Sequence, residues 1–534
     1  MGKQVVFDAA ARSALQEGLD ILANAVKATL GPKGRNAAIE RAYGPPLITK
    51  DGVSVARSIT LSNRIQNMGA ELVKSVASST NSLAGDGTTT ATVLAQAIYT
   101  EGSKMVAAGH NPVLIKRGID KAVEVVLGRL KDISTPVLDD VTIKNVAIIS
   151  ANNDSALGEL IGSVVSAVGD DGLISVEEAA GAETTVEYTE GMSIDRGYIS
   201  PVFVNNQDRL TVEFDNPLVL LFDGKISSTY DVMPILEAVS EANRPLLIIA
   251  QTVESEALQT LALNNTRGSL SSCVIRAPGF GDMRLDQLGD IAAVTGAKIF
   301  SPSHGHALRD AMISDLGSAR KIISTRISTS IIDGDGTKDS IAKRINSLKV
   351  QLSNASGLES YEVSAFKQRL SSLSGSIAVL RVGGVSEAEV KEKRDRVEDA
   401  INAVKAAIEE GIVPGGGSAL LHCLSALDTY RDNSNLITEE LVGVDVVSKA
   451  IRAPFVQILC NAGIEHHLFM EHIAASDNLM SGFNAYTGSP SEDMVADGVI
   501  DPVKVVRTAL ENAASSSGTL LTTEVVVFEE DSSD

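Results

Sequence analysis

The chain has 534 residues, a formal net charge of −22, 44% hydrophobic residues, 4% aromatic residues and no tryptophan. This length allows roughly three or four domains with aliphatic cores, and the acidity argues against a nucleic-acid-binding protein, whose footprint would be basic. No apolar run approaches the ~20 residues needed to cross a bilayer. The three cysteines fit a reducing compartment better than a disulfide framework, and we interpret Cys273, Cys423 and Cys460 as small buried apolar residues.

The pattern from residue 8 to 132 is predominantly helical. SALQEGLDILANAVKATL and NPVLIKRGIDKAVEVVLGRLKDI both show amphipathic helical spacing. The apolar face of the first of these helices is formed by Leu15, Leu19, Ile21, Leu22 and Val26. Between the helices we expect glycine-bearing turns at GPKGRN and TKDGVSVA.

The stretch AGDGTTTATVLAQAI, residues 84–98, places two glycines around an aspartate and then three threonines before a helical run. Glycine lets the main chain approach a ligand, and an exposed helix N-terminus attracts anions. A carboxylate beside an anion site is suited to a hard cation. The stretch therefore predicts nucleotide phosphates with Mg²⁺ held by Asp86, although taken alone it fits a capped turn equally well.

Short apolar runs alternate with helical stretches in the middle of the chain, at roughly 191–376. PLVLLFDG, RPLLIIAQ, SCVIRAPG and AKIFSP read as strands of a parallel sheet with helices against its faces. Two of the helices, DVMPILEAV and ALQTLALNN, carry apolar side chains that either form a groove for flexible apolar chains or pack on the sheet. On the pattern alone, packing on the sheet is favoured.

SEAEVKEKRDRVEDAINAVKAAIEEG predicts a helix with a capping box formed by Ser386 and Glu389. Its buried stripe consists of Val390, Val397, Ile401, Val404 and Ile408. Asp399 lies about 200° around the helix from Val397, off that stripe. It is a candidate base for hydrolysis, and the sequence alone favours a solvated charge.

The pattern after this helix is again mainly helical, interrupted by the glycine-rich VPGGGSALL. The last residues, VVVFEEDSSD, predict a strand followed by a frayed acidic tail. The N-terminal and C-terminal regions are both mainly helical, unlike the alternating strands and helices of the middle. We therefore expect one base domain built from both ends, a connector, and an inserted α/β domain.

Other chemistries have little support. No Walker A motif, no GxGxxG after a predicted strand and no GxSxG occurs. In EHHLFMEH, His467 and His472 are five residues apart, which departs from the HExxH spacing of zinc hydrolases, and we interpret the stretch as a helix-surface cluster.

Eight motifs in register resemble signatures of the group I chaperonins, the GroEL-like chaperonin-60 family: TLGPKGRN, TKDGVSVA, AGDGTTTATVLAQAI, ISANND, EGMSIDRGYISP, RAPGFGD, RVEDA and EEGIVPGGG. The resemblance runs over almost the whole chain. It implies a multidomain α/β fold with a discontinuous, mainly helical equatorial domain at 1–132 and 410–534. A small α/β intermediate hinge domain at 133–190 and 377–409 and an inserted α/β apical domain at 191–376 complete the expected architecture.

The resemblance also implies an ATPase with ATP, Mg²⁺ and K⁺ as candidate cofactors, in which Asp399 and Asp51 are catalytic and Asp86 binds the metal. The implied nucleotide-binding residues are Thr29, Leu30, Gly31, Pro32, Lys50, Asp86, Gly87, Thr88, Thr89, Thr90, Gly416, Asn484, Ala485 and Asp501. The implied contacts to client and co-chaperonin are Tyr198, Phe203, Met233, Leu236, Leu258, Ala262 and Leu263.

The implied partners are non-native polypeptides, a GroES-like co-chaperonin and further subunits in heptameric rings, single, double or mixed, with neither nucleic acid nor membrane. Val202 and Tyr486 depart from the family pattern, which supports the alternative of a specialised subunit that functions only in mixed rings. The chain also ends without the Gly-Met-rich tail of many relatives. We expect a soluble, reducing compartment, with the plastid stroma favoured over the bacterial cytoplasm and the mitochondrial matrix.

Overall fold

The computed structural model describes residues 3–40, 46–137, 139–151, 154–169, 173–179, 181–207, 209–353, 366, 369–370, 372–373 and 376–529. The acidic tail expected after the last strand lies outside these residues. The chain divides into two compact units. The first unit comprises Met1–Ser166, Glu178–Glu183 and Val382–Asp534, and the second comprises Ala167–Glu177 and Thr184–Arg381. Both chain ends thus fold together, while the division into three domains stays a prediction.

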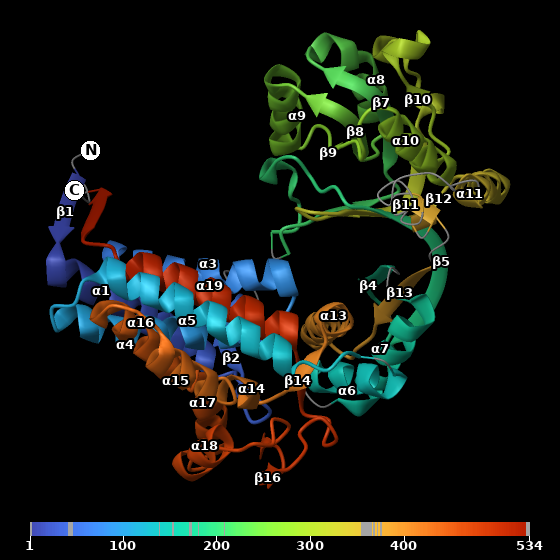
Figure 1. Ribbon diagram of the computed structural model, residues 1–534. Coiled ribbons are helices and arrows are strands. Elements are labelled where there is room, and N and C mark those ends of the chain that lie inside the picture. The colour runs from blue at the N-terminus through green and yellow to red at the C-terminus, as the bar shows by residue number, and fades with distance from the viewer. Residues whose placement is uncertain are drawn as a thin grey trace. The chain divides into compact units, whose positions relative to one another are not determined.

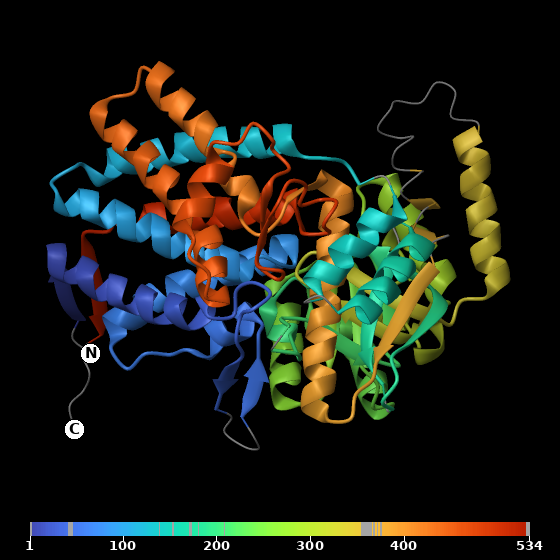
Figure 2. The same ribbon diagram turned by 90° about the horizontal axis from the view of Figure 1, so that it is seen from below.

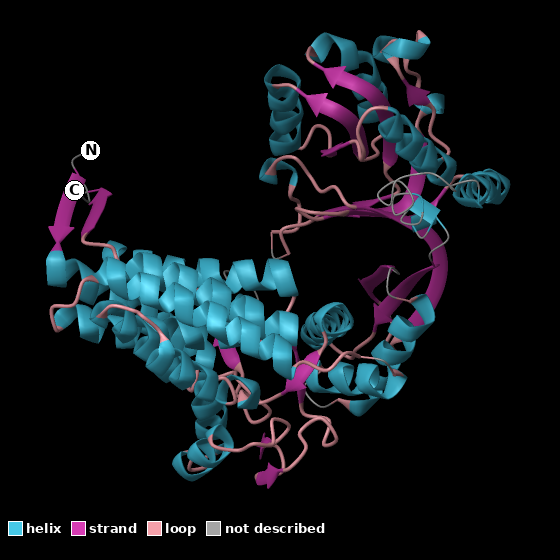
Figure 3. Cartoon of the chain, viewed as in Figure 1, coloured by secondary structure: helices cyan, strands magenta, loops and turns pink. Residues whose placement is uncertain are grey.

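The first unit is mainly helical (Figure 3). Its N-terminal helices are α1 (Asp8–Lys27), α2 (Gly52–Ser58), α3 (Arg64–Ala84), α4 (Thr88–Ala107), α5 (Pro112–Ile133), α6 (Asp140–Ser150) and α7 (Ser155–Val168). Its C-terminal helices are α13 (Glu387–Glu410), α14 (Ser418–Leu421), α15 (Leu424–Asn433), α16 (Thr438–Ala450), α17 (Ala453–Ala462), α18 (His467–Ala474) and α19 (Val503–Leu521). The long last helix α19 packs along α3, α4 and α5, so segments from opposite ends of the chain share one aliphatic core (Figure 1).

Short strand pairs complete this unit. The first and last strands, β1 (Lys3–Phe7) and β18 (Val525–Glu529), pair antiparallel, so the described ends of the chain lie side by side (Figure 2). The other pairs are β2 (Ala37–Ile39) with β3 (Leu47–Thr49), β14 (Ile412–Pro414) with β17 (Ile500–Pro502), and β15 (Gly482–Asn484) with β16 (Ser489–Ser491).

Two local predictions in the first unit are wrong. Ile21 was assigned to the buried face of α1, but its side chain is 45% exposed, because the residues that face the core lie on the i, i+3, i+4 positions occupied by Leu15, Leu19 and Leu22. The predicted turn TKDGVSVA is instead the junction between β3 and α2, where Asp51 caps the helix.

The second unit is built on a ten-stranded mixed sheet of order β4-β13-β5-β12-β11-β7-β8-β9, with β10 pairing β7 and β6 pairing β11. The parallel strands, which the sequence predicted, are β7 (Leu218–Ile226), β8 (Leu246–Val253), β9 (Ser272–Arg276) and β10 (Ile299–Phe300). The others are β4 (Leu173–Glu178), β5 (Thr185–Ile194), β6 (Val212–Asp215), β11 (Gly317–Ser324), β12 (Thr329–Gly334) and β13 (Ser376–Val382). The helices of this unit are α8 (Thr229–Glu241), α9 (Ser255–Arg267), α10 (Asp282–Thr295) and α11 (Lys338–Ser353).

The cysteine interpretation is right for two residues of three. Cys273 and Cys423 are buried, and burial raises the pKa of each thiol to about 12. Both thiols therefore stay protonated and unreactive at neutral pH. Cys460 is exposed, which corrects its assignment to a core. Among the described residues, no helix combines the length and the apolarity that a membrane crossing requires.

Candidate active site

A cavity of about 480 Å³ lies within the first unit. Every residue that the sequence analysis assigned to catalysis, nucleotide or metal lines it, although these residues come from segments far apart in the chain. They are Thr29, Leu30, Gly31, Pro32, Lys50, Asp51, Asp86, Gly87, Thr88, Thr89, Thr90, Asp399, Gly416, Asn484, Ala485 and Asp501. The fold thus brings these residues together, and their individual roles remain predictions.

The N-terminus of α4 opens into the cavity. Its N-cap Gly87 has a left-handed φ of 81°, and a Cβ there would lie 2.6 Å from Cγ1 of Val505 on α19. Only glycine therefore allows this turn, which places Thr88, Thr89 and Thr90 in the first helical turn. The amides of a first turn lack intrahelical acceptors and lie at the positive end of the helix dipole, so this end of the cavity suits phosphate oxygens.

Asp51 is the N-cap residue of α2. Its carboxylate caps α2 by accepting hydrogen bonds from the backbone amides of Val53, at 3.1 Å, and Ser54, at 2.8 Å. The backbone amide of Asp51 itself donates to Oγ1 of Thr49 at 3.0 Å. The cap holds this carboxylate in one place beside the cavity.

Asp86 occupies the turn between α3 and α4. Its Oδ1 accepts a hydrogen bond from the amide of Gly87, and its Oδ2 accepts one of 3.0 Å from Oγ of Ser150, the last residue of α6. Burial raises the pKa of Asp86, and the nearby Asp51 charge raises it further against the lowering effect of the two hydrogen bonds. A cation at this position would stabilise the ionised carboxylate.

Asp399 projects from α13 into the same cavity. The helix begins as predicted, with Oγ of Ser386 accepting from the amide of Glu389 at 3.2 Å. The carboxylate of Glu389 accepts from the amide of Val385 at 3.0 Å and also interacts with the backbone of Ser386, which agrees with the predicted capping box. Burial raises the pKa of Asp399 well above its ordinary value, and the charges of Asp86 and Asp51 raise it further. Asp399 therefore lines an enclosed site, which corrects the solvated charge favoured by the sequence.

Asp501 adds a fourth carboxylate. Burial and the Asp86 charge raise its pKa to about 7, while a hydrogen bond with the backbone of Gly416 acts in the opposite direction. All four residues are half-buried, and like charges held close together stay ionised more readily when a cation neutralises them. The cavity is also lined by Lys50 and Arg396, but acidic side chains outnumber these two basic ones, so its lining favours a bound cation.

The donor set fits Mg²⁺ rather than a metal caged by protein alone. Within the described residues, the cavity carboxylates do not bring three ligand atoms together at metal-binding distance. Mg²⁺ usually takes one or two carboxylates and completes its octahedron with water and substrate phosphates. Asp86 next to the α4 N-terminus offers that combination.

The far wall of the cavity is a tight turn after β15. Oδ1 of Asn484 accepts from the amides of Tyr486, at 3.0 Å, and Thr487, at 3.3 Å, which fixes the turn. The ring of Phe483 packs against that of Phe469, with centroids 4.4 Å apart and planes tilted by 44°, so an aromatic pair supports the wall. Tyr486 lines the cavity and is 64% exposed, so its ring is free to meet a bound ligand.

Ser150 is a site residue that the sequence analysis did not assign, although it lies in the quoted motif ISANND. Its contact with Asp86 depends on how α6 packs against α13, which no local pattern reveals. The only available signal was the motif itself.

The predicted client contacts lie in the second unit and differ in accessibility. Met233 on α8 and Leu263 on α9 are 39% and 48% exposed. Leu258, Ala262 and Tyr198 are half-buried. Phe203 and Leu236 are 3% and 4% exposed and pack in the apolar core of this unit, and the client-binding role of all seven residues stays a prediction.

Comparison with known proteins agrees with this geometry. Residues 22–531 match the TCP-1/cpn60 chaperonin family. The chain is similar to crystal structures of the chaperonin gp146 from the bacteriophage EL 2 (Pseudomonas aeruginosa) in the presence of ATP-BeFx. In crystal form II the TM-score is 0.70 at 23% identity, and in crystal form I it is 0.64 at 22% identity; 99% of each chain is covered in both. At this identity the likeness establishes the fold, which is the expected GroEL-like multidomain α/β architecture.

Proposed function

Because this chain belongs to the TCP-1/cpn60 chaperonin family, we propose that it is an ATP-hydrolysing subunit of the group I, GroEL-like type. In this proposal it binds non-native polypeptides and promotes their folding in a ring cavity that a co-chaperonin closes. The observation that carries the ATPase part is the single cavity that joins Asp86, Asp399 and the N-terminus of α4. The crystal structure of the similar chaperonin gp146 was determined in the presence of ATP-BeFx, which supports a nucleotide as the ligand here.

Hydrolysis assigns separate tasks to the residues of the cavity. The amides of Thr88, Thr89 and Thr90 would bind phosphate oxygens, and Asp86 would hold Mg²⁺, which neutralises charge that develops on the transferred phosphoryl group. Asp399 would accept the proton of the attacking water. Burial and the charge of Asp86 raise the pKa of Asp399, which makes its ionised carboxylate a stronger base towards water.

The client-binding part rests on exposed apolar side chains in the second unit, Met233 and Leu263. Burying apolar surface of a non-native chain against such side chains is worth about 25 cal/mol per Å², before the entropy cost of binding is subtracted. Heptameric rings, a GroES-like partner and the division into equatorial, intermediate and apical domains belong to the same proposal.

The test combines two activities of the purified chain. We expect Mg²⁺-dependent ATP hydrolysis that denatured protein stimulates, and ATP-dependent recovery of a denatured client when the co-chaperonin is present. Stimulation by a metabolite instead of by unfolded protein would point to a small-molecule phosphotransferase. ATP turnover without any client capture, alone or with sister subunits, would contradict the proposal.

A second candidate is a specialised subunit that is active only in mixed rings. The exposed Tyr486 at the cavity wall supports it, because a ring there changes the volume and chemistry of the site. Native mass measurement separates the two candidates. A ring of the isolated chain supports the general chaperonin, and a monomer that joins rings only with a related subunit supports the specialised one.

A further inference from the structure

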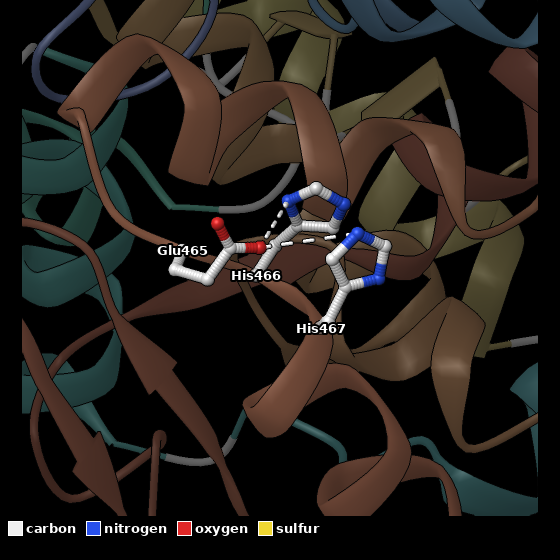
Figure 4. A group of neighbouring side chains, drawn as sticks. All are labelled: Glu465, His466 and His467. Atoms are coloured by element: carbon white, nitrogen blue, oxygen red, sulfur yellow. Dashed lines mark ion pairs between the residues drawn. The ribbon is translucent and has the colours of Figure 1, made fainter.

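Three consecutive side chains outside the nucleotide cavity converge at the turn between α17 and α18 (Figure 4). Oε1 of Glu465 lies 3.8 Å from Nδ1 of His466 and 3.8 Å from Nε2 of His467. One ligand atom from each residue falls within 4.8 Å of the other two, and no other group of this kind occurs in the described part of the chain. Imidazole nitrogen and carboxylate oxygen are ligands of divalent transition metals.

The backbone of this turn is anchored at both sides. The amides of Gly463 and Ile464 close the end of α17 by donating to the carbonyls of Cys460, at 3.0 Å, and Leu459, at 2.9 Å. On the other side the amide of Met470 donates to the carbonyl of His466 at 3.0 Å, which begins α18. Holding the turn in place lowers the entropy cost of assembling a site there.

One of the three side chains is largely buried and the other two are exposed. The side chain of His466 is 19% exposed, whereas those of Glu465 and His467 are 72% and 73% exposed. The two imidazole centroids are 4.1 Å apart, tilted by 34°. Ligand atoms of tetrahedral Zn²⁺ lie about 3.3 Å from each other, given bond lengths of about 2.0–2.2 Å. The two exposed side chains therefore need to move by about 0.5–1.5 Å to bring all three ligand atoms to this spacing.

We propose that Glu465, His466 and His467 form a binding site for Zn²⁺ or a similar divalent transition ion, with one coordination position left to water. Nitrogen ligands favour such ions over Mg²⁺ and Ca²⁺, which prefer oxygen alone. The positive end of the α18 dipole opposes a cation, and the carboxylate of Glu465 offsets it. Glu471 is not a ligand of this site, because it pairs with Arg452 at 3.2 Å. The site therefore differs from the HExxH type considered for this stretch of sequence.

The test is a Zn²⁺ titration of the full-length chain after chelator treatment, followed by calorimetry in millimolar Mg²⁺ so that oxygen-only sites are filled. We expect one Zn²⁺ per chain with a dissociation constant of about micromolar. His467→Ala and Glu465→Gln should each weaken binding at least about tenfold, because each removes one of three ligands. Both residues are exposed, so these variants should fold. The matched control is His472→Ala, on the same helix and outside the cluster, which should leave binding unchanged.

Co²⁺ supplies a second measurement, since its visible absorption changes in position and intensity when protein ligands replace water. The wild-type spectrum should show bands that disappear in His467→Ala and persist in His472→Ala. Absence of Zn²⁺ binding by the wild-type chain up to millimolar concentration would overturn the proposal. Equal binding by the His467 and His472 variants would do the same, because the metal would then lie elsewhere.

Discussion

Oγ of Ser150 donates a 3.0 Å hydrogen bond to Oδ2 of Asp86, joining residues that are 64 positions apart in the chain. This contact links the end of α6 to the turn that we propose binds Mg²⁺. It favours the ionised form of a carboxylate whose pKa burial raises. In the proposed site, Ser150 would therefore act on Mg²⁺ through Asp86.

Ser150→Ala should raise the Mg²⁺ concentration required for half-maximal ATP hydrolysis by about tenfold, because a hydrogen bond to a charged group is worth about 1.5–3 kcal/mol. The matched control is Ser163→Ala, whose hydroxyl donates to the carbonyl of Glu159 within α7. Identical Mg²⁺ dependence in wild type and Ser150→Ala would contradict the role of this contact.

The two partners of this contact also show what a sequence can reveal. Asp86 was predicted because its signal is local: glycines, a carboxylate and a threonine-rich helix start within a few residues. Ser150 was not, because its role arises only when α6 packs beside α13. Asp399 was predictable only in part. Its place off the apolar stripe was predictable, but helical spacing cannot tell an enclosed cavity from open solvent.

The second unit shows the same limit at the level of the fold. Its parallel strands were predicted because buried strands separated by helices give a strong apolar pattern, as in Leu218–Ile226 and Leu246–Val253. The antiparallel part was missed because β11 and β12 alternate buried and half-buried residues with many polar ones. Their pairing depends on long-range register that a short pattern does not encode.

Asp399→Ala should retain ATP binding and lose turnover by at least about a hundredfold, because a positioned general base contributes about 10²–10⁴. Single-turnover hydrolysis and nucleotide-binding affinity measure the two effects separately. Glu409→Ala is the matched control, since Glu409 lies on the same helix and pairs with Lys504. Normal turnover in Asp399→Ala would remove this residue from the mechanism.

Gly87→Ala should abolish ATP binding and lower the melting temperature. The new Cβ would lie 2.6 Å from Cγ1 of Val505 and would also force a non-glycine residue to adopt a φ of 81°. Gly109→Ala separates the two causes. Gly109 has a φ of 95°, with nothing within 4 Å of an added Cβ, so its variant carries the backbone strain of about 1–2 kcal/mol alone. Equal melting temperatures and ATP affinities in the two variants would show that close packing at Gly87 is unimportant.

Leu263→Ser should weaken capture of a denatured client without lowering the melting temperature, because this side chain is 48% exposed on α9. Leu236→Ala should instead lower the melting temperature more than it weakens client capture. Leu236 is 4% exposed, and truncating a buried leucine costs about 2–5 kcal/mol of stability. Light scattering of an aggregating client and thermal unfolding measure the two effects. Full client protection by Leu263→Ser would move the binding surface away from α9.

Asp501→Asn should stabilise the nucleotide-free chain increasingly as pH rises from about 4 to above 7. The folded-state pKa of Asp501 is raised from 3.8 to about 7, chiefly by burial. Its protonated form therefore favours the folded state at low pH, and this contribution is lost as pH rises through the folded pKa. The loss amounts to at most about 4 kcal/mol. Asparagine is neutral throughout and keeps an oxygen to accept from Gly416.

The measurement is the melting temperature of wild type and Asp501→Asn between pH 4 and pH 8, without Mg²⁺ or nucleotide. The difference between the two curves reports Asp501 together with its interaction with the charge of Asp86. Asp477→Asn serves as the control because Asp477 is exposed and outside the cavity, so its curve should follow wild type. A constant difference between Asp501→Asn and wild type across this range would mean that Asp501 is ionised in the folded protein throughout, and the cavity would then already contain the positive charge that its carboxylates require.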